Sequence, residues 1–181
     1  MTYQHGRALL AKGDATGARH DFEAALAAGY PSAGVDLASM LSTSDPAQAG
    51  KLLEIAWGKG IPIAAFSLGA LYENSPAPDQ ARAWSWYQKA ADAGEPNALA
   101  RFGRRAEEGS DLLQAFKFYA AAAERARNEY WPDDMWKDWR YRRAYLARLL
   151  AREGKMAGVA EQYAQVRQKY PAPFATLLTS P

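Results

Sequence analysis

The feature that most constrains this chain is an internal repeat of five positions. Asp79, Ala83, Tyr87, Ala90 and Gly94 are spaced by 4, 4, 3 and 4 residues, and the same order and spacing recur three more times with small changes. The other copies are Asp14, Ala18, Phe22, Ala25 and Gly29; Asp45, Ala49, Leu53, Ala56 and Gly60; and Asp111, Ala115, Tyr119, Ala122 and Ala126. The aspartates are therefore 31, 34 and 32 residues apart. A period of this length is typical of helical repeats, in which each unit buries its apolar face against the next.

The spacing also predicts the local structure of each unit. Steps of three and four residues keep side chains on one face of an α-helix. The aspartate at the start can accept hydrogen bonds from the free amides of the first turn. The alanines allow a neighbouring helix to approach closely, and the larger residue fills the space between layers. Glycine ends the helix in the first three copies, because it tolerates a left-handed cap, and proline follows within two residues.

A second pattern of small and apolar residues precedes each of these helices, for example Ala64, Leu68 and Gly69. We therefore expect an all-α chain of about five antiparallel helix pairs that forms a single domain over residues 1–181. The expected units are residues 3–32, 33–63, 64–97, 98–126 and 139–170, with residues 127–138 as an insert that fits neither pattern.

Two segments carry a resemblance to a known family. Residues 68–72, Leu-Gly-Ala-Leu-Tyr, and residues 86–94, Trp-Tyr-Gln-Lys-Ala-Ala-Asp-Ala-Gly, resemble the Sel-one-like repeat, a relative of the tetratricopeptide repeat. The first unit is similar to the tetratricopeptide pattern, with Tyr3, Gly6 and Phe22 in order. The chain departs from the family at Arg105, where an apolar residue is usual. The resemblance implies a right-handed α-solenoid whose first helices line a concave surface, an adaptor role in protein binding, and no reaction.

The insert has an unusual composition. It contains Trp131 and Trp136 together with Asp133 and Asp134, and Trp139 follows directly. In one interpretation the tryptophans fill the gap between the fourth and fifth units, since large aromatic side chains are usually well buried. In the other, they form an aromatic anchor with an acidic rim, as at many protein interfaces. The sequence leaves both interpretations open.

A second candidate surface consists of residues that point away from the repeat positions of the first helices. At about 100° per residue, Tyr141, Tyr145, Arg148 and Arg152 fall in one narrow sector. The corresponding residues of the preceding unit are Arg101 and Arg104. In the second and third units they are Asp36, Ser39, Ser67 and Ala70. Arginine and tyrosine bind acidic segments well, although a solvated face without a partner is the alternative.

Composition excludes several classes of function. The chain has no cysteine and two histidines, and no catalytic, phosphate-binding or dinucleotide-binding motif is present. We therefore expect no enzyme, cofactor or metal. Residues 101–181 carry 15 Lys and Arg against 10 Asp and Glu, but no nucleic-acid-binding motif accompanies this excess. No apolar run is long enough to span a bilayer. The chain as written is expected in the cytoplasm, or in the periplasm if a signal peptide was removed.

These observations predict a non-catalytic scaffold or adaptor that binds another protein or peptide, such as an acidic segment, through its concave face and the Trp-rich insert. The alternative is an immunity protein that binds and blocks a bacterial toxin or effector. Recognition of cell-wall glycans by the tryptophans of the insert is a third, less favoured use. Self-association through an uncapped terminal repeat is also possible on this sequence.

Overall fold

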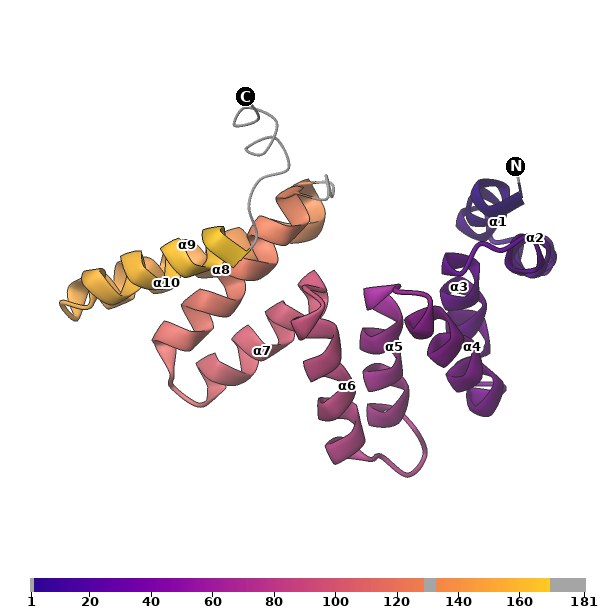
Figure 1. The fold of residues 1–181 in the computed structure, drawn as a ribbon, viewed down its shortest axis with the longest axis horizontal. Coiled ribbons are helices and arrows are strands. Elements are labelled where there is room, and N and C mark those ends of the chain that lie inside the picture. Colours follow the sequence, from indigo (N-terminus) through magenta and orange to yellow (C-terminus); the bar gives the residue numbers. More distant parts are fainter. Residues whose placement is uncertain (1, 129–132, 170–181) are drawn as a thin grey trace. The chain divides into compact units, whose positions relative to one another are not determined.

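The computed structural model describes residues 2–128 and 133–169, and Asp133 only by its backbone. These residues form ten helices and, within the described ranges, no strand. The helices are α1 (Thr2–Ala11), α2 (Ala15–Ala27), α3 (Ser32–Leu41), α4 (Pro46–Gly58), α5 (Pro62–Glu73), α6 (Gln80–Asp92), α7 (Pro96–Glu108), α8 (Leu112–Asn128), α9 (Asp133–Arg152) and α10 (Met156–Lys169). Short turns join most of them, so that they follow one another as five pairs (Figure 1). The expected all-α fold class is confirmed.

The predicted helix starts are confirmed by their caps. The carboxylate of Asp14 accepts a hydrogen bond from the Gly17 amide at 2.9 Å, and Asp45 accepts one from the Gln48 amide at the same distance. Asp79 and Asp111 cap α6 and α8 in the same way. Each bond satisfies an amide that has no partner within its own helix.

The predicted helix ends are confirmed by backbone conformation. Gly29, Gly60 and Gly94 have φ values of 87°, 79° and 80°, which is the left-handed region that side chains with a Cβ avoid. The fourth copy of the repeat has Ala126 at this position, and α8 accordingly continues to Asn128. The absence of a glycine therefore makes this helix longer than α2, α4 and α6.

The chain divides into two compact units, Met1–Ala90 and Ala91–Pro181, called unit 1 and unit 2 below. Unit 1 holds α1 to α5 and most of α6. Its core combines residues of α3 and α5 with the three middle positions of each repeat, all of which are buried. These are Ala18, Phe22 and Ala25 of α2, Ala49, Leu53 and Ala56 of α4, and Ala83, Tyr87 and Ala90 of α6. The one-domain expectation stays a prediction.

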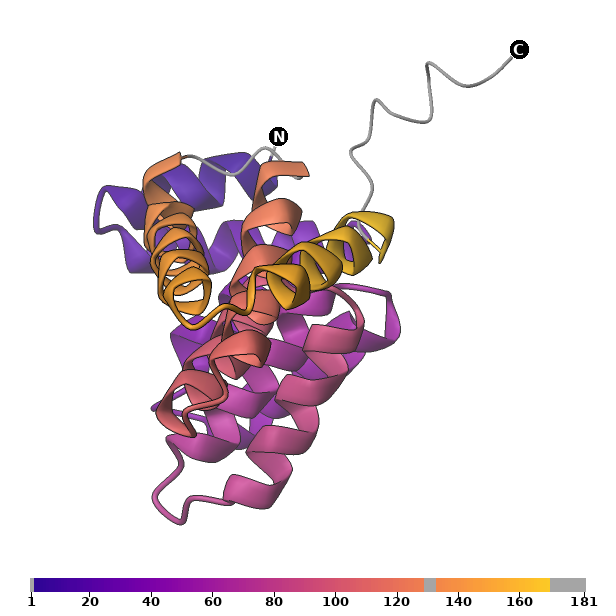
Figure 2. The same cartoon turned by 90° about the vertical axis from the view of Figure 1, so that its left-hand side faces the viewer.

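Unit 2 is built around α8, whose repeat residues Ala115, Tyr119, Ala122 and Ala126 are buried. Both α9 and α10 lie against α8 (Figure 2), and they contact each other less extensively. Leu146 and Leu150 of α9 and Val159 and Val166 of α10 fill the space between these helices. The last pair is thus more open than the first two, as expected for a terminal repeat.

Helix α9 differs from the expectation at its start. It begins at Asp133, so residues 133–138, which the sequence pattern assigns to an insert, form its first turns. The reason is that Trp136, Trp139, Leu146 and Leu150 fall on one helical face, which α9 turns toward α8. The repeat pattern missed these turns because tryptophan stands where the other units have alanine or leucine.

Candidate functional site

Helix α9 presents four of the predicted residues to solvent. Tyr141, Tyr145, Arg148 and Arg152, called the α9 stripe below, are spaced by four, three and four residues and lie on one face. Tyr141 is 69% exposed and Tyr145 49%, and both arginines are exposed. Among the described residues, no hydrogen bond, ion pair or ring contact involves any of the four. The α9 stripe is therefore available to a partner.

The turns of α9 that precede the stripe also expose charged residues. Asp134 and Asp138 are both exposed, and they lie one turn apart on the same side of α9. The carboxylate of Asp138 accepts a hydrogen bond from Nε of Arg142 at 3.2 Å. The exposed surface of α9 thus carries both signs of charge at its N-terminal end, where Lys137 and Arg140 are exposed as well, two tyrosines in the middle and two arginines at its C-terminal end.

The two predicted arginines of α7 are placed differently from each other. Arg104 is exposed, and its charge acts on the phenol of Tyr119. Arg101 is partly buried and interacts within the chain. The side chain of Arg104 is therefore accessible to a partner, while that of Arg101 contributes to the packing of α7.

A cluster that sequence reasoning missed joins α7, α8 and α9. Nη1 of Arg142 donates to Oε2 of Glu107 at 2.7 Å, and the Tyr119 hydroxyl donates to the same oxygen at 3.2 Å. The Arg142 guanidinium also lies 5.8 Å from the centre of the Tyr119 ring. Glu107 therefore has a structural role, because it connects α7 to α8 and α9 within unit 2.

The environment of Tyr119 changes its acidity. Burial raises the pKa of Tyr119 to about 12, and the negative charge of Glu107 acts in the same direction. The positive charges of Arg142 and Arg104 act against it but are the weaker influence. The phenol is therefore neutral at physiological pH and serves as a hydrogen-bond donor. One signal for this cluster was present in the sequence, since a buried tyrosine needs a hydrogen-bond partner.

The predicted residues of the insert do not form a common surface in the described structure. Trp136 is only 6% exposed and packs against Ala123 and Ala126 of α8, with Trp139 beside it. The guanidinium of Arg140 lies 4.7 Å from the centre of the Trp136 ring. This geometry favours the core interpretation for Trp136 over the exposed anchor. Trp131 and the side chain of Asp133 lie outside the described residues.

In unit 1, the predicted outward positions have a different character. Ser39 of α3 and Ser67 and Ala70 of α5 line a pocket of about 410 Å³. Asp36, the fourth such position, interacts with Tyr3 of α1, and burial together with a hydrogen bond to Asp36 raises the pKa of Tyr3. The outward face of the first helices is thus small and hydroxyl-bearing in unit 1, and aromatic and charged in unit 2.

The described residues were also considered for metal-binding groups and for membrane-spanning helices. No three side chains of the metal-binding types histidine, aspartate or glutamate are grouped as a metal site requires, among residues 2–128 and 133–169. No helix of the same described part is long and apolar enough to cross a membrane.

Comparison with solved structures finds chains of similar fold. No protein-family profile and no curated protein sequence matches the chain. The crystal structure of a Sel1 repeat protein from Oxalobacter formigenes superimposes with a TM-score of 0.58, over 93% of this chain and 71% of that one, at 19% sequence identity. The chain has the fold of a Sel1 repeat protein. The Sel1 repeat fold is the one that the motifs at residues 68–72 and 86–94 indicated, so the fold expectation from the resemblance is confirmed.

Proposed function

We propose that this chain is a non-catalytic protein-binding module that contacts its partner through the α9 stripe. The observation that carries this proposal is the exposure of Tyr141 and Tyr145 beside Arg148 and Arg152 on one rigid helix. Exposed tyrosine and arginine are the residues that most often dominate the energy of protein interfaces. A helix already ordered by its packing on α8 presents them without a large ordering cost.

The charge pattern of α9 specifies the kind of partner. Arg148 and Arg152 have no carboxylate partner among the described residues, so an acidic segment of another protein would supply one. The partner segment should therefore place its acidic residues over the C-terminal half of α9 and its apolar contacts over the two tyrosines.

The test is capture from native extract with a matched pair of charge reversals. The stripe variant carries Tyr145→Ala and Arg148→Glu, and the control carries Arg167→Glu, which is exposed on α10 of the same unit. We expect a protein that binds the parent and the control but is lost from the stripe variant, and its binding should weaken as salt is raised. Circular dichroism verifies that all three chains are folded.

Capture of the same proteins by all three chains would overturn the proposal. The captured protein also separates the two uses that the sequence leaves open. A structural or signalling component indicates a scaffold, whereas a toxin or effector that loses its activity in the complex indicates an immunity protein.

A further inference from the structure

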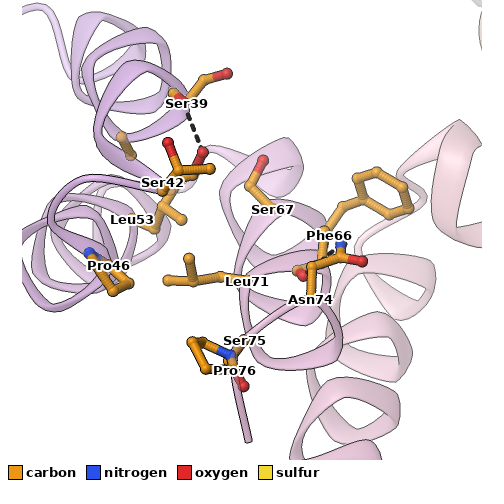
Figure 3. Close-up of a pocket in the computed structure, with 13 residues that line it drawn as sticks. Ser39, Ser42, Pro46, Leu53, Phe66, Ser67, Leu71, Asn74, Ser75 and Pro76 are labelled. Atoms are coloured by element: carbon orange, nitrogen blue, oxygen red, sulfur yellow. Dashed lines mark hydrogen bonds between the residues drawn. The ribbon is translucent and has the colours of Figure 1, made fainter. Parts of the chain in front are cut away.

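The pocket in unit 1 is walled by three helices and two turns. Its lining comes from α3 and the turn after it, from α4, and from α5 and the turn after it (Figure 3). The lining residues are Ala38, Ser39, Ser42, Thr43, Pro46, Leu53, Phe66, Ser67, Ala70, Leu71, Asn74, Ser75 and Pro76. Leu53 of α4 and Leu71 of α5 point toward each other across it (Figure 3). All of these residues belong to one compact unit, so the pocket is formed within unit 1.

The chemistry of this lining is neutral throughout. None of the thirteen residues is ionisable near neutral pH, and apolar side chains form the floor. A charged group placed here would lose its hydration without gaining an ion pair, which is strongly unfavourable. The pocket therefore selects against charge, in contrast to the α9 stripe of unit 2.

Three of the six polar side chains of the lining already make hydrogen bonds within the chain. The hydroxyl of Ser42 donates to the Ser39 carbonyl at 2.8 Å, that of Ser75 donates to the Ala77 carbonyl at 2.7 Å, and the amide of Asn74 donates to the Ala70 carbonyl at 2.9 Å. The hydroxyls of Ser39 and Ser67 make no hydrogen bond to any described residue. They lie on two different helices that border the pocket (Figure 3). These two hydroxyls, together with that of Thr43, are thus available to a ligand.

We infer that this pocket binds a neutral aromatic side chain, phenylalanine or tyrosine, on an extended segment of a partner protein. A volume of about 410 Å³ accommodates such a side chain with part of its backbone, and lies in the range of small ligand sites. The floor of Leu53 and Leu71 would contact the ring, and the hydroxyls of Ser39 and Ser67 would bond the peptide backbone or a phenol. The inference rests on the proposed protein-binding function. It concerns unit 1 and an uncharged pocket, whereas the α9 stripe lies in unit 2 and includes two arginines.

The test uses fluorescent peptides of the sequence Ser-Thr-Ala-X-Ala-Thr-Ser, in which X is Phe, Tyr, Ala, Glu or Lys. Binding to the full chain is followed by fluorescence anisotropy. We expect the Phe and Tyr peptides to bind at least about tenfold more tightly than the Glu and Lys peptides. Equal binding of the Phe and Ala peptides would overturn the inference.

Two variants show whether binding occurs in the pocket. Ala70→Trp fills it and should weaken binding of the Phe peptide by about tenfold or more. Ser39→Glu changes an exposed residue at the edge, so folding is not at risk, and it should strengthen binding of the Lys peptide by about fivefold. Unchanged affinities in both variants would place the peptide elsewhere and overturn the inference.

The stripe variant, Tyr145→Ala with Arg148→Glu, is the matched control for this experiment. It should bind the Phe peptide like the parent, because α9 contributes nothing to this pocket. If the stripe variant captures the same proteins as the parent, the proposed use of α9 fails while the peptide selectivity still stands. If the peptides show no selectivity, the pocket inference fails while the result on α9 still stands.

Discussion

The same arrangement of glycine, tyrosine and glutamate occurs in both units, and a comparison of the two copies shows how the last helices of unit 2 are attached. In unit 1, Gly69 of α5 packs against the ring of Tyr87, and the Tyr87 hydroxyl donates to Oε2 of Glu73 at 2.8 Å. In unit 2, Gly103 of α7 packs against the ring of Tyr119 in the same way, and the hydroxyl donates to Glu107. The glycine and the glutamate are four residues apart in each case.

The difference is the arginine of α9. Glu107 also accepts from Arg142, so in unit 2 the arrangement connects α7 and α8 to the last pair of helices. The two copies also differ in tightness. A Cβ built on Gly69 would lie 2.5 Å from the Tyr87 ring, whereas one on Gly103 would lie 3.2 Å from the Tyr119 ring. The packing of glycine against tyrosine is therefore tighter in unit 1, and in unit 2 the arrangement includes an ion pair with α9.

The largest effect should come from removing that tryptophan. Trp136→Ala deletes a side chain that is 6% exposed and packed on Ala123 and Ala126, so we expect the free energy of unfolding to fall by about 3 kcal/mol or more. Urea unfolding measures this loss. Trp136→Phe retains most of the apolar contact and should lose less. A loss below about 1 kcal/mol for Trp136→Ala would mean that α9 does not depend on this side chain.

The next effect compares the two glycines. Gly69→Ala forces a Cβ into the Tyr87 ring, and we expect a net destabilisation of about 2 kcal/mol. Gly103→Ala needs only a small shift of the Tyr119 ring, and the gain of about 1 kcal/mol in helix propensity should cancel most of the strain. Urea unfolding of the two variants provides the comparison. Equal losses would show that the two packing sites are not distinct.

The fold was predictable from local sequence because each repeat position acts through its own helix. Asp45 caps the amide of Gln48 three residues later, and Gly60 sets the backbone of its own turn, so both effects are visible in a short window. The burial of Tyr87 and Tyr119 follows from the same helical spacing.

The candidate site was predictable only in part, because contacts between distant residues leave no such pattern. The exposure of Tyr141 and Tyr145 followed from helix geometry alone. Glu107 has a counterpart in Glu73, but its partner Arg142 lies 35 residues away. The role of Trp136 depends on which face of α8 lies opposite it, which composition does not specify. The scaffold, immunity and glycan-binding alternatives stay predictions, since a partner's identity is not encoded in the repeat.

A smaller effect should come from the ion pair between Glu107 and Arg142 in unit 2. Glu107→Gln removes the charge that Arg142 binds, and Arg142→Met removes the guanidinium while keeping an apolar side chain. Both side chains are partly exposed, at 27% and 36%, so solvent weakens the pair and each change should cost about 1 kcal/mol. The double variant should cost less than the sum, with a coupling of about 0.5 kcal/mol or more. Additive losses would show that the contact does not stabilise the terminal repeat.

The last prediction concerns Tyr119 of unit 2 at high pH. The ordinary pKa of a tyrosine is 10, and burial raises that of Tyr119 to about 12. Between these values the unfolded chain releases the phenolic proton while the folded chain retains it, so folding becomes less favourable as pH rises. The stabilisation from this group is complete below pH 10 and is lost as pH rises through about 12, and it is on the order of 2 kcal/mol.

Unfolding free energies of the parent and of Tyr119→Phe, measured across this range, isolate the contribution as their difference. That difference should shrink as pH rises, because phenylalanine has no proton to release. Tyr87→Phe removes the corresponding hydroxyl in unit 1 and provides the matched variant. A difference between the parent and Tyr119→Phe that does not change with pH would mean that the Tyr119 hydroxyl ionises as readily in the folded chain as in the unfolded one, and that its bond to Glu107 does not hold the proton.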